Sequence, residues 1–233
     1  WRRERKKEIK EAILDKQREI KSDWQDEAGH TYLLEIDPYH WLRLVDNLIQ
    51  YGKIADTTVD GVQYDSYMLA PLGMKVEKSL HENLHVYITY YLFKAARVFN
   101  SGLSLMQFVF YIPVFVSCIA LIAAFLLFLS ISNNGGSVAG FFAVISLGLS
   151  RIFLGRSVAG WFDTDPYIIL FSVLSVWMFY LSLDYGRNRA RRALFALFSG
   201  LSIGLFSFSW DGWWYILDLM LISALMWQKI NII

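Results

Sequence analysis

The chain has 233 residues, a formal net charge of +1 and an apolar fraction of 55%, with aromatic residues at 17%. That apolar fraction is high for a soluble domain, and most of the charge lies before Gly102, which predicts a polar front segment followed by a membrane-embedded body. The near-neutral charge gives no argument for nucleic-acid binding, and the lone Cys118 excludes an intrachain disulfide.

Residues 1–29 form a charged segment ahead of the apolar body. Opposite charges recur three or four positions apart, as for Glu4 and Glu8 with Lys7 and Lys10, which predicts a solvated helix. A weak apolar stripe along this helix leaves open an alternative role as an anchor on anionic lipid.

We interpret residues 30–105 as an external region that carries interfacial helices. Residues 38–49 have the pattern of a short amphipathic helix with Asp37 as its N-cap. Residues 52–79 contain several glycines and few apolar runs, which predicts a loop. Residues 80–99 predict an apolar, Tyr-rich helix that lies at the membrane interface or enters the membrane.

Residues 106–233 predict a bundle of transmembrane helices. The first apolar run is long enough for a tilted crossing, and the later ones are near the short limit. A soluble all-α protein with buried helices is the alternative, but five such runs in succession argue against it. We therefore predict an all-α polytopic membrane protein with a structured external loop. The five predicted spans are Met106–Ile131, Ser137–Leu154, Tyr167–Leu183, Ala193–Trp210 and Trp213–Trp227.

Basic residues predict the orientation of these spans. The linker 184–192 carries four arginines, which places it in the cytoplasm. Counting spans from there puts loop 155–166, region 30–105 and the Asp211-Gly212 break together on the opposite face of the membrane.

The N-terminus conflicts with this topology. Its basic residues favour the cytoplasm, yet no apolar span separates them from region 30–105. Either the N-terminal helix lies on the same face as region 30–105, or, as a second hypothesis, a span is missing from the chain at this point. This hypothesis predicts a Cα separation far above about 3.8 Å between two neighbouring residues in 20–37.

Two acidic motifs, Glu35-Ile36-Asp37 and Asp163-Thr164-Asp165, fall on the same predicted face. Carboxylates that lie close together favour a cation between them, and Mg²⁺ or Mn²⁺ prefers such oxygen ligands. Arg156 precedes the second motif and could neutralise or orient one of its carboxylates. The structural alternatives are helix caps at Asp37 and Asp165.

An aromatic motif, Ser209–Tyr215, falls on this face as well. Aromatic residues at a membrane interface commonly form a belt, and the alternative is a wall for a sugar or a polyprenyl chain. The four histidines have no spacing typical of a metal site, so structural roles are favoured for them. The tryptophans of the motif are Trp210, Trp213 and Trp214.

Taken together, these motifs resemble the catalytic subunit of oligosaccharyltransferases, the membrane enzymes of protein N-glycosylation, and look closest to the archaeal and eukaryotic-type members. The resemblance covers roughly residues 30–227, in the family's order. Its most specific element is Arg156–Asp165. The resembling segments are Asp37–Arg43, Ala70–Gly73, Phe110–Pro113, Ser150-Arg151 with Arg156–Asp165, and Trp210–Tyr215.

The resemblance implies the N-terminal part of a C-type glycosyltransferase (GT-C) fold with its active site on the extracytoplasmic or ER-luminal face. It implies transfer of an oligosaccharide from a dolichyl phosphate or pyrophosphate carrier to the Asn of an Asn-X-Ser/Thr sequon in an acceptor polypeptide, with possible accessory subunits. Asp37, Arg156 and Asp163 would be catalytic. A divalent metal, Mn²⁺ or Mg²⁺, would be held by Asp37, Asp163 and Asp165. The donor-binding residues would be Trp210, Trp213 and Trp214.

The chain also departs from the family. A span before the first acidic motif, the later spans, a catalytic glutamate and the sequon-reading domain are not visible, so the chain alone is expected to be inactive. The alternatives are another GT-C enzyme that uses a polyprenyl-phosphate sugar, and a non-catalytic transporter or membrane scaffold.

Overall fold

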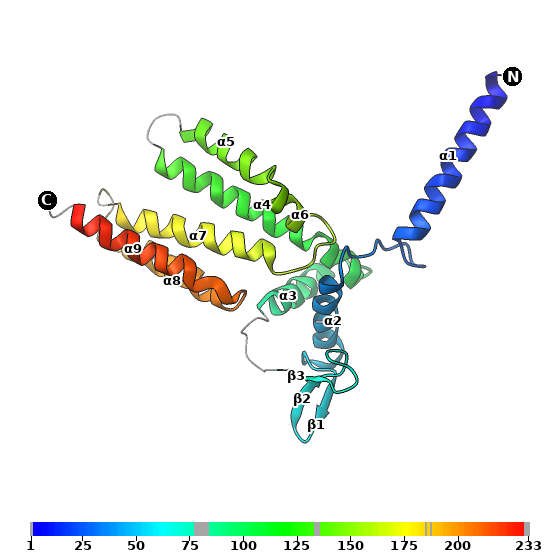
Figure 1. Cartoon of the computed structure of the whole chain (residues 1–233), viewed down its shortest axis with the longest axis horizontal. Helices are drawn as coiled ribbons and strands as arrows, with labels where there is room; N and C mark the ends of the chain where they lie inside the picture. The colour runs from blue at the N-terminus through cyan, green and yellow to red at the C-terminus, as the bar shows by residue number, and fades with distance from the viewer. Residues whose placement is uncertain (1, 77–83, 133–135, 185, 187, 231–233) are drawn as a thin grey trace.

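The computed structural model describes residues 2–76, 84–132, 136–184, 186 and 188–230. The chain is mainly helical, and its long helices lie side by side along the longest axis of the molecule (Figure 1). The elements of the predicted external region 30–105 gather at one end of that bundle, which also carries both acidic motifs. This end is called the external end below, after that prediction.

The predicted charged helix is present as α1 (Arg2–Trp24) and stands away from the rest of the chain (Figure 1). Its side chains are exposed nearly throughout, and ion pairs link neighbouring turns, as between Lys16 and Glu19 at 2.6 Å. Such exposed pairs contribute little stability each.

The expected chain break in residues 20–37 is not found. After α1 the chain folds back on itself: the Tyr32 N–H donates to the Trp24 carbonyl at 2.9 Å, and the Asp26 N–H donates to the His30 carbonyl at 2.9 Å. A hydrogen-bonded turn thus joins α1 to the chain before the first motif, and the missing span stays a prediction.

Helix α2 (Ile36–Tyr51) begins slightly earlier than predicted. Its N-cap is Glu35, which is extended at φ −140°, so Asp37 lies in the first turn and is not the cap. The helix ends at Gly52, whose φ of 68° is the left-handed conformation that glycine adopts without strain. Its inner face is buried, and the Asn47 amide donates to the Ile54 carbonyl at 2.7 Å to hold the following loop.

The region predicted as a loop contains a small antiparallel sheet, so the all-α description was wrong there. The strands β1 (Thr57–Val59), β2 (Val62–Asp65) and β3 (Met74–Lys75) pair in the order β1-β2-β3. Asp60 and Gly61 form the first hairpin turn, both at positive φ, which matches the right-handed twist of paired strands.

Two of the five predicted spans are confirmed as single helices long and apolar enough to cross a membrane. They are α4 (Leu105–Ile131) and α7 (Asp165–Leu183). The segment Ser137–Leu154 is not one helix: α5 (Gly136–Gly148) and α6 (Arg151–Ser157) are bent by 68° at the Ser150 N-cap. The described residues thus hold two such helices, or three if this bent pair forms one span.

The last two predicted spans form helices with shifted bounds. Helix α8 (Arg189–Ser207) starts inside the arginine-rich linker, so its first turn is charged. The short 3₁₀ helix η1 (Asp211–Trp213) leads directly into α9 (Trp214–Ile230). Within the described part of the chain, neither α8 nor α9 combines the length and the apolar composition that a membrane crossing requires, as α4 and α7 do.

Polar side chains link the helices of the bundle. The Ser199 hydroxyl of α8 donates to the Ser175 carbonyl of α7 at 2.9 Å, and the Trp177 indole N–H donates to the Ser130 hydroxyl of α4 at 3.0 Å. Hydrogen bonds of this kind hold helices together where surrounding lipid offers no competing partner.

Gly160 joins three segments at the external end of the bundle. Its N–H donates to the Phe110 carbonyl of α4 at 2.8 Å, and its own carbonyl accepts from the Leu34 N–H at 3.2 Å. The loop before the second acidic motif is thereby tied both to a membrane-length helix and to the chain just before the first motif.

Gly160→Ala should therefore loosen the external end. At φ +91° an alanine is strained, and its Cβ would lie 3.0 Å from the Phe110 ring and 3.2 Å from Leu34. We expect thermal unfolding in detergent to show a loss of about 1–3 kcal/mol. Gly155→Ala, in α6 with open space around it, is the matched control and should be neutral or slightly stabilising. Equal effects of the two variants would contradict the joint role of Gly160.

Candidate active site

Asp163 is held by the first acidic region. Its Oδ1 accepts hydrogen bonds from the Trp41 indole N–H of α2 at 3.0 Å and from the Thr164 N–H at 2.6 Å. Trp41 lies four residues after Asp37 on the same helix, so this hydrogen bond links α2, which carries the first motif, to the second motif. The Oδ2 atom accepts no hydrogen bond from the described residues.

Asp37 lies within electrostatic range of Asp163. The pKa of the Asp163 carboxyl is raised by burial first, then by the negative charges of Asp165 and Asp37, while hydrogen bonds from the Thr164 N–H and Trp41 oppose the rise. Asp37 itself is exposed and makes no hydrogen bond with the described residues. The structure therefore brings the two motifs together, as the sequence predicted.

The carboxylate of Asp165 is bound by residues that shortly precede it in the chain. Its Oδ2 accepts from Arg156 at 3.0 Å and from the Trp161 indole N–H at 3.0 Å, and the Arg156 guanidinium lies 4.6 Å from the centre of the Trp161 ring. Arg156 thus orients the second motif from α6, whose position depends on the break between α5 and α6. Asp165 also begins α7, with Thr164 as the N-cap.

The described residues contain no group of three or more His, Cys, Asp or Glu side chains that could hold a metal ion. The carboxylates of Asp37 and Asp163 remain, which interact electrostatically, and one oxygen of Asp163 accepts no hydrogen bond from the described part of the chain. Carboxylate oxygens are the type of ligand that a hard divalent cation prefers, but two carboxylates are too few to complete its coordination.

The tryptophan motif reaches the acidic site through a row of aromatic rings. Trp210 stacks on Phe206 with centroids 5.8 Å apart, and Phe206 lies 6.4 Å from Phe171. Phe171 stacks on Tyr167 at 6.1 Å, and Tyr167 lies 5.3 Å from His85. Beyond this row, Trp213 packs against the core and Trp214 is exposed at 57%.

His85, from α3 (Leu84–Phe99), is a buried part of the site that the sequence did not single out. It is fully buried, contacts the rings of Trp41 at 5.6 Å and Phe162 at 4.2 Å, and neither ring nitrogen has a hydrogen-bond partner among the described residues. Burial lowers its pKa to about 3. His85 is thus a neutral ring that packs behind Trp41, the donor to Asp163.

This burial predicts a pH-dependent stability. Between pH 6.5 and 3 the unfolded chain binds a proton at His85 that the folded chain does not, so the free energy of unfolding falls as the pH falls through this window. From pH 7 to 5 the loss is about 2 kcal/mol. His85→Phe should remove it, as measured by thermal unfolding at both pH values. The same loss in variant and parent would contradict this role.

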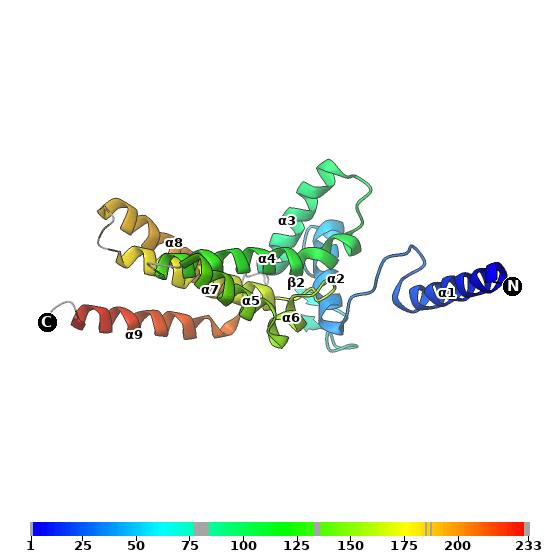
Figure 2. The same cartoon turned by 90° about the horizontal axis from the view of Figure 1, so that it is seen from above.

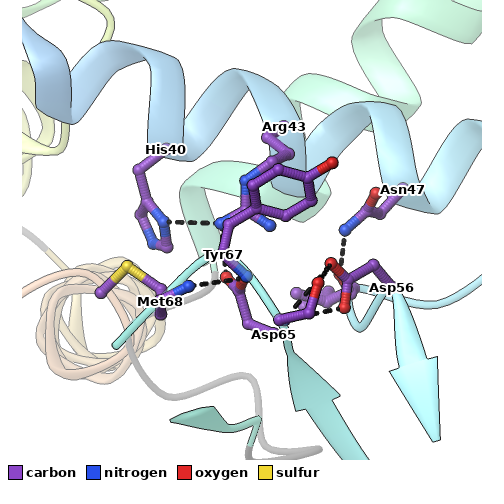
Figure 3. A network of polar contacts seen from close by, with 9 residues as sticks. His40, Arg43, Asn47, Asp56, Asp65, Tyr67 and Met68 are labelled. Atoms are coloured by element: carbon purple, nitrogen blue, oxygen red, sulfur yellow. Dashed lines mark hydrogen bonds and ion pairs between the residues drawn. The ribbon is translucent and has the colours of Figure 1, made fainter. Parts of the chain in front are cut away.

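A second polar network lies between α2 and the small sheet (Figure 3). The Arg43 guanidinium forms an ion pair with Asp65, which is 1% exposed, and the Tyr67 and Met68 N–H groups donate to the same carboxylate at 3.0 and 3.2 Å. The Tyr67 ring covers Arg43 at 4.9 Å. The pKa of His40 is lowered, first by burial of its ring and second by the positive charge of Arg43.

This network lines a cavity of about 630 Å³ that opens next to the first acidic motif. Ile36 and Tyr39, which flank Asp37 closely in sequence, both line it, as do Arg43 and Tyr67. The Arg43–Asp65 pair therefore joins the small sheet to the helix that carries Asp37.

Comparisons with known proteins agree with this arrangement. The family model described as oligosaccharyl transferase STT3, N-terminal, matches residues 12–230. A dolichyl-phosphooligosaccharide-protein glycotransferase of Methanococcus voltae is 30% identical over 199 residues, which is 82% of this chain and 21% of that protein. A protein of the same name from Methanocaldococcus jannaschii is 31% identical over 183 residues, 76% of this chain and 18% of that protein.

Solved structures share the fold. Archaeal oligosaccharyltransferase AglB from Archaeoglobus fulgidus, in complex with an inhibitory peptide and a dolichol-phosphate, matches with a TM-score of 0.64 at 20% identity, over 83% of this chain and 22% of that one. An Archaeoglobus fulgidus oligosaccharyltransferase in complex with Zn and sulfate gives 0.63 at 19% identity, over 83% of this chain and 23% of that one.

The architecture is thus of the class found in archaeal oligosaccharyltransferases: a mainly helical chain with membrane-length helices and acidic loops at one end. The chain belongs to the oligosaccharyl transferase STT3, N-terminal, family, and the resemblance expected from the sequence is confirmed. It spans about a fifth of the length of the two curated relatives.

Proposed function

We propose that this chain supplies part of the active site of a membrane oligosaccharyltransferase. The reaction transfers an oligosaccharide from a dolichyl phosphate or pyrophosphate carrier to the Asn side chain of an Asn-X-Ser/Thr sequon. The observation that carries the proposal is the convergence of Asp37 and Asp163, from opposite parts of the chain, around the Trp41 hydrogen bond. The family and the names of the two curated relatives support the reaction class.

The chemical role of Asp37 follows from the weakness of the nucleophile. The lone pair of an amide nitrogen is delocalised, so the acceptor Asn attacks slowly unless that delocalisation is reduced. The exposed Asp37 carboxylate is available to accept a hydrogen bond from the amide N–H and to orient the nitrogen toward the anomeric carbon. Asp163 has one oxygen available in the same way.

We further propose that Asp37 and Asp163 would be ligands of Mn²⁺ or Mg²⁺. Asp165, predicted from the sequence as a third ligand, would need to exchange its hydrogen bonds with Arg156 and Trp161 to join them. The cation, when bound, neutralises negative charge that develops on the departing phosphate. Burial first, and then the negative charges of Asp165 and Asp37, raise the pKa of Asp163, and a bound cation would offset all three effects. The remaining ligands would come from the substrate or from other parts of the enzyme.

The other candidate residues act around this pair. Arg156 would hold Asp165 in place through their ion pair. Trp210, Trp213 and Trp214 would contact the lipid-linked donor, and the row of aromatic rings from Trp210 to His85 would fix their position relative to the acidic pair.

The proposed setting is a multi-pass membrane protein with the acidic loops on the extracytoplasmic or ER-luminal face, in an archaeal cell membrane or in the endoplasmic reticulum. The arginines at the start of α8 support a cytoplasmic position for the opposite end of the bundle. Accessory subunits would contact the helices that remain exposed.

The test is Asp37→Ala in a polypeptide with the full length of the curated relatives, with formation of glycosylated sequon peptide as the readout. We expect transfer to fall by at least about 100-fold. Asp46→Ala, on the same helix but hydrogen-bonded to Gln50, is the matched control and should retain transfer. Undiminished transfer by the Asp37 variant would refute the proposed role.

The 233-residue chain on its own should form no glycosylated peptide, because its described residues provide only part of a cation site. A lipid-linked donor, a sequon peptide and Mn²⁺ incubated with the purified chain would check this. Product formation above the level without protein would show that the site is complete within this chain.

A further inference from the structure

The outer half of α3 projects sideways from the bundle. Figure 2 shows α3 leaving the line of the long helices, with its C-terminal end farthest out. The first half is buried against the core, but Val98 is 82% exposed and Phe99 is 92% exposed. These are large apolar side chains at a tip that no described element of the chain covers.

The tip lies at the start of a membrane-length helix. A short turn joins Phe99 to the Ser104 N-cap of α4, and Phe93 packs on Phe108 at 5.4 Å, so α3 crosses the first turns of α4. With α4 placed across the membrane, as its length and apolar composition allow, its first turns would lie at the level of the interface. The exposed tip of α3 would then lie at the depth of lipid headgroups and upper acyl chains.

Two cations flank a pocket beside this tip. Lys94 and Arg97 line a hollow of about 400 Å³ together with Tyr90 and Val98. Neither cation has a carboxylate within 4.0 Å among the described residues. Each makes one local hydrogen bond, Lys94 to the Tyr90 hydroxyl at 3.3 Å and Arg97 to the Ser101 carbonyl at 3.1 Å, which leaves most of their N–H donors available.

We propose that Lys94 and Arg97 bind the phosphate of an anionic phospholipid headgroup, while Val98 and Phe99 enter the acyl-chain region. Long cationic side chains at an interface extend toward headgroups while adjacent apolar residues insert below them. An acidic protein segment would also match the two cations, but it would leave the apolar tip in water. The lipid accounts for both features.

The contact would set the depth of the acidic site. Helix α3 packs on α2, which carries Asp37, and its His85 packs behind Trp41. A headgroup bound at the outer half of α3 would hold this unit at a fixed level in the membrane. This consequence rests on the proposed function, whereas the lipid contact does not.

Native mass spectrometry of the full chain in detergent tests the contact directly. We expect phosphatidylglycerol to bind more tightly than phosphatidylcholine, and Lys94→Gln/Arg97→Gln to weaken phosphatidylglycerol binding by about 30-fold. Lys94→Arg/Arg97→Lys keeps both charges and should retain binding. Lys6→Gln/Lys10→Gln removes two exposed charges from α1 and is the matched control, which should change nothing.

Three outcomes would overturn the proposal. The first is equal binding of the two lipids, and the second is an equal loss of binding in the α3 and α1 variants. The third is displacement of the bound lipid by about 10 mM inorganic phosphate, because a lipid that is also held by its acyl chains should not be displaced by the free anion at that concentration. None of these readouts requires glycosyl transfer, so failure of the lipid contact and failure of the proposed function are distinguishable.

Discussion

Asp163→Asn is expected to abolish most glycosyl transfer in a polypeptide with the full length of the relatives. Asparagine keeps the size of the side chain and one oxygen that can accept from the Trp41 indole and the Thr164 N–H. It removes the negative charge, which is the property that a cation and a reacting amide would use. We expect initial rates to fall by about 10²–10³-fold, measured with saturating donor and sequon peptide.

Asp60→Asn is the control for this change. Asp60 lies in the exposed turn of the small sheet at positive φ, a conformation that asparagine tolerates well. Its charge is removed in the same way, but far from the convergence of the two motifs. If the Asp163 and Asp60 variants transfer equally well, the carboxylate of Asp163 has no role in the reaction.

Trp41→Phe separates the position of Asp163 from its charge. The variant keeps an aromatic ring against His85 but loses the N–H that donates to Asp163 at 3.0 Å. Loss of such a supporting hydrogen bond commonly costs about 10–100-fold in metal affinity or activity. Because Trp41 acts through Asp163, its effect should nearly vanish in the Asp163→Asn background.

The sequence predicted the helices with strong patterns and the convergence of the two acidic motifs. Charge spacing was sufficient for α1, and long apolar runs were sufficient for α4 and α7. Topology counting placed Asp37 and Asp163 on one face, and their electrostatic coupling agrees. The roles of the individual residues stay predictions.

Other features carried a local signal that was overlooked. The Asp60-Gly61 pair between Thr57–Val59 and Val62–Asp65 is typical of a hairpin, and it marks the sheet that was predicted as a loop. Ser150 before Arg151 has the pattern of an N-cap, and it ends the helix that was predicted to continue to Leu154.

The environment of His85 had no local signal. Its ring neighbours come from α2, from the loop before Asp163 and from α7, so only the assembled fold shows that the side chain is enclosed and neutral. The ion pair of Asp65 with Arg43 is a similar case, because an acidic residue in a glycine-containing stretch is usually solvated.

Arg43→Met is expected to produce the largest loss of stability in the external region. Asp65 is 1% exposed, so removing the guanidinium leaves a buried carboxylate with only the Tyr67 and Met68 N–H groups as partners. Breaking one side of a buried ion pair typically costs about 3–5 kcal/mol. For a chain of this size, each kcal/mol lowers the melting temperature by about 2–4 °C.

The pair can be tested without confusing charge with packing. Arg43→Met/Asp65→Asn removes both charges and keeps an oxygen for the two backbone N–H groups, so it should be clearly more stable than Arg43→Met alone. Tryptophan fluorescence would follow unfolding, and limited trypsin cleavage after Lys53 and Lys75 would report opening of the sheet. A melting temperature of Arg43→Met within about 1 °C of the parent would show that the carboxylate is solvated or neutral without its partner. The small sheet would then be only loosely joined to the helix that carries Asp37.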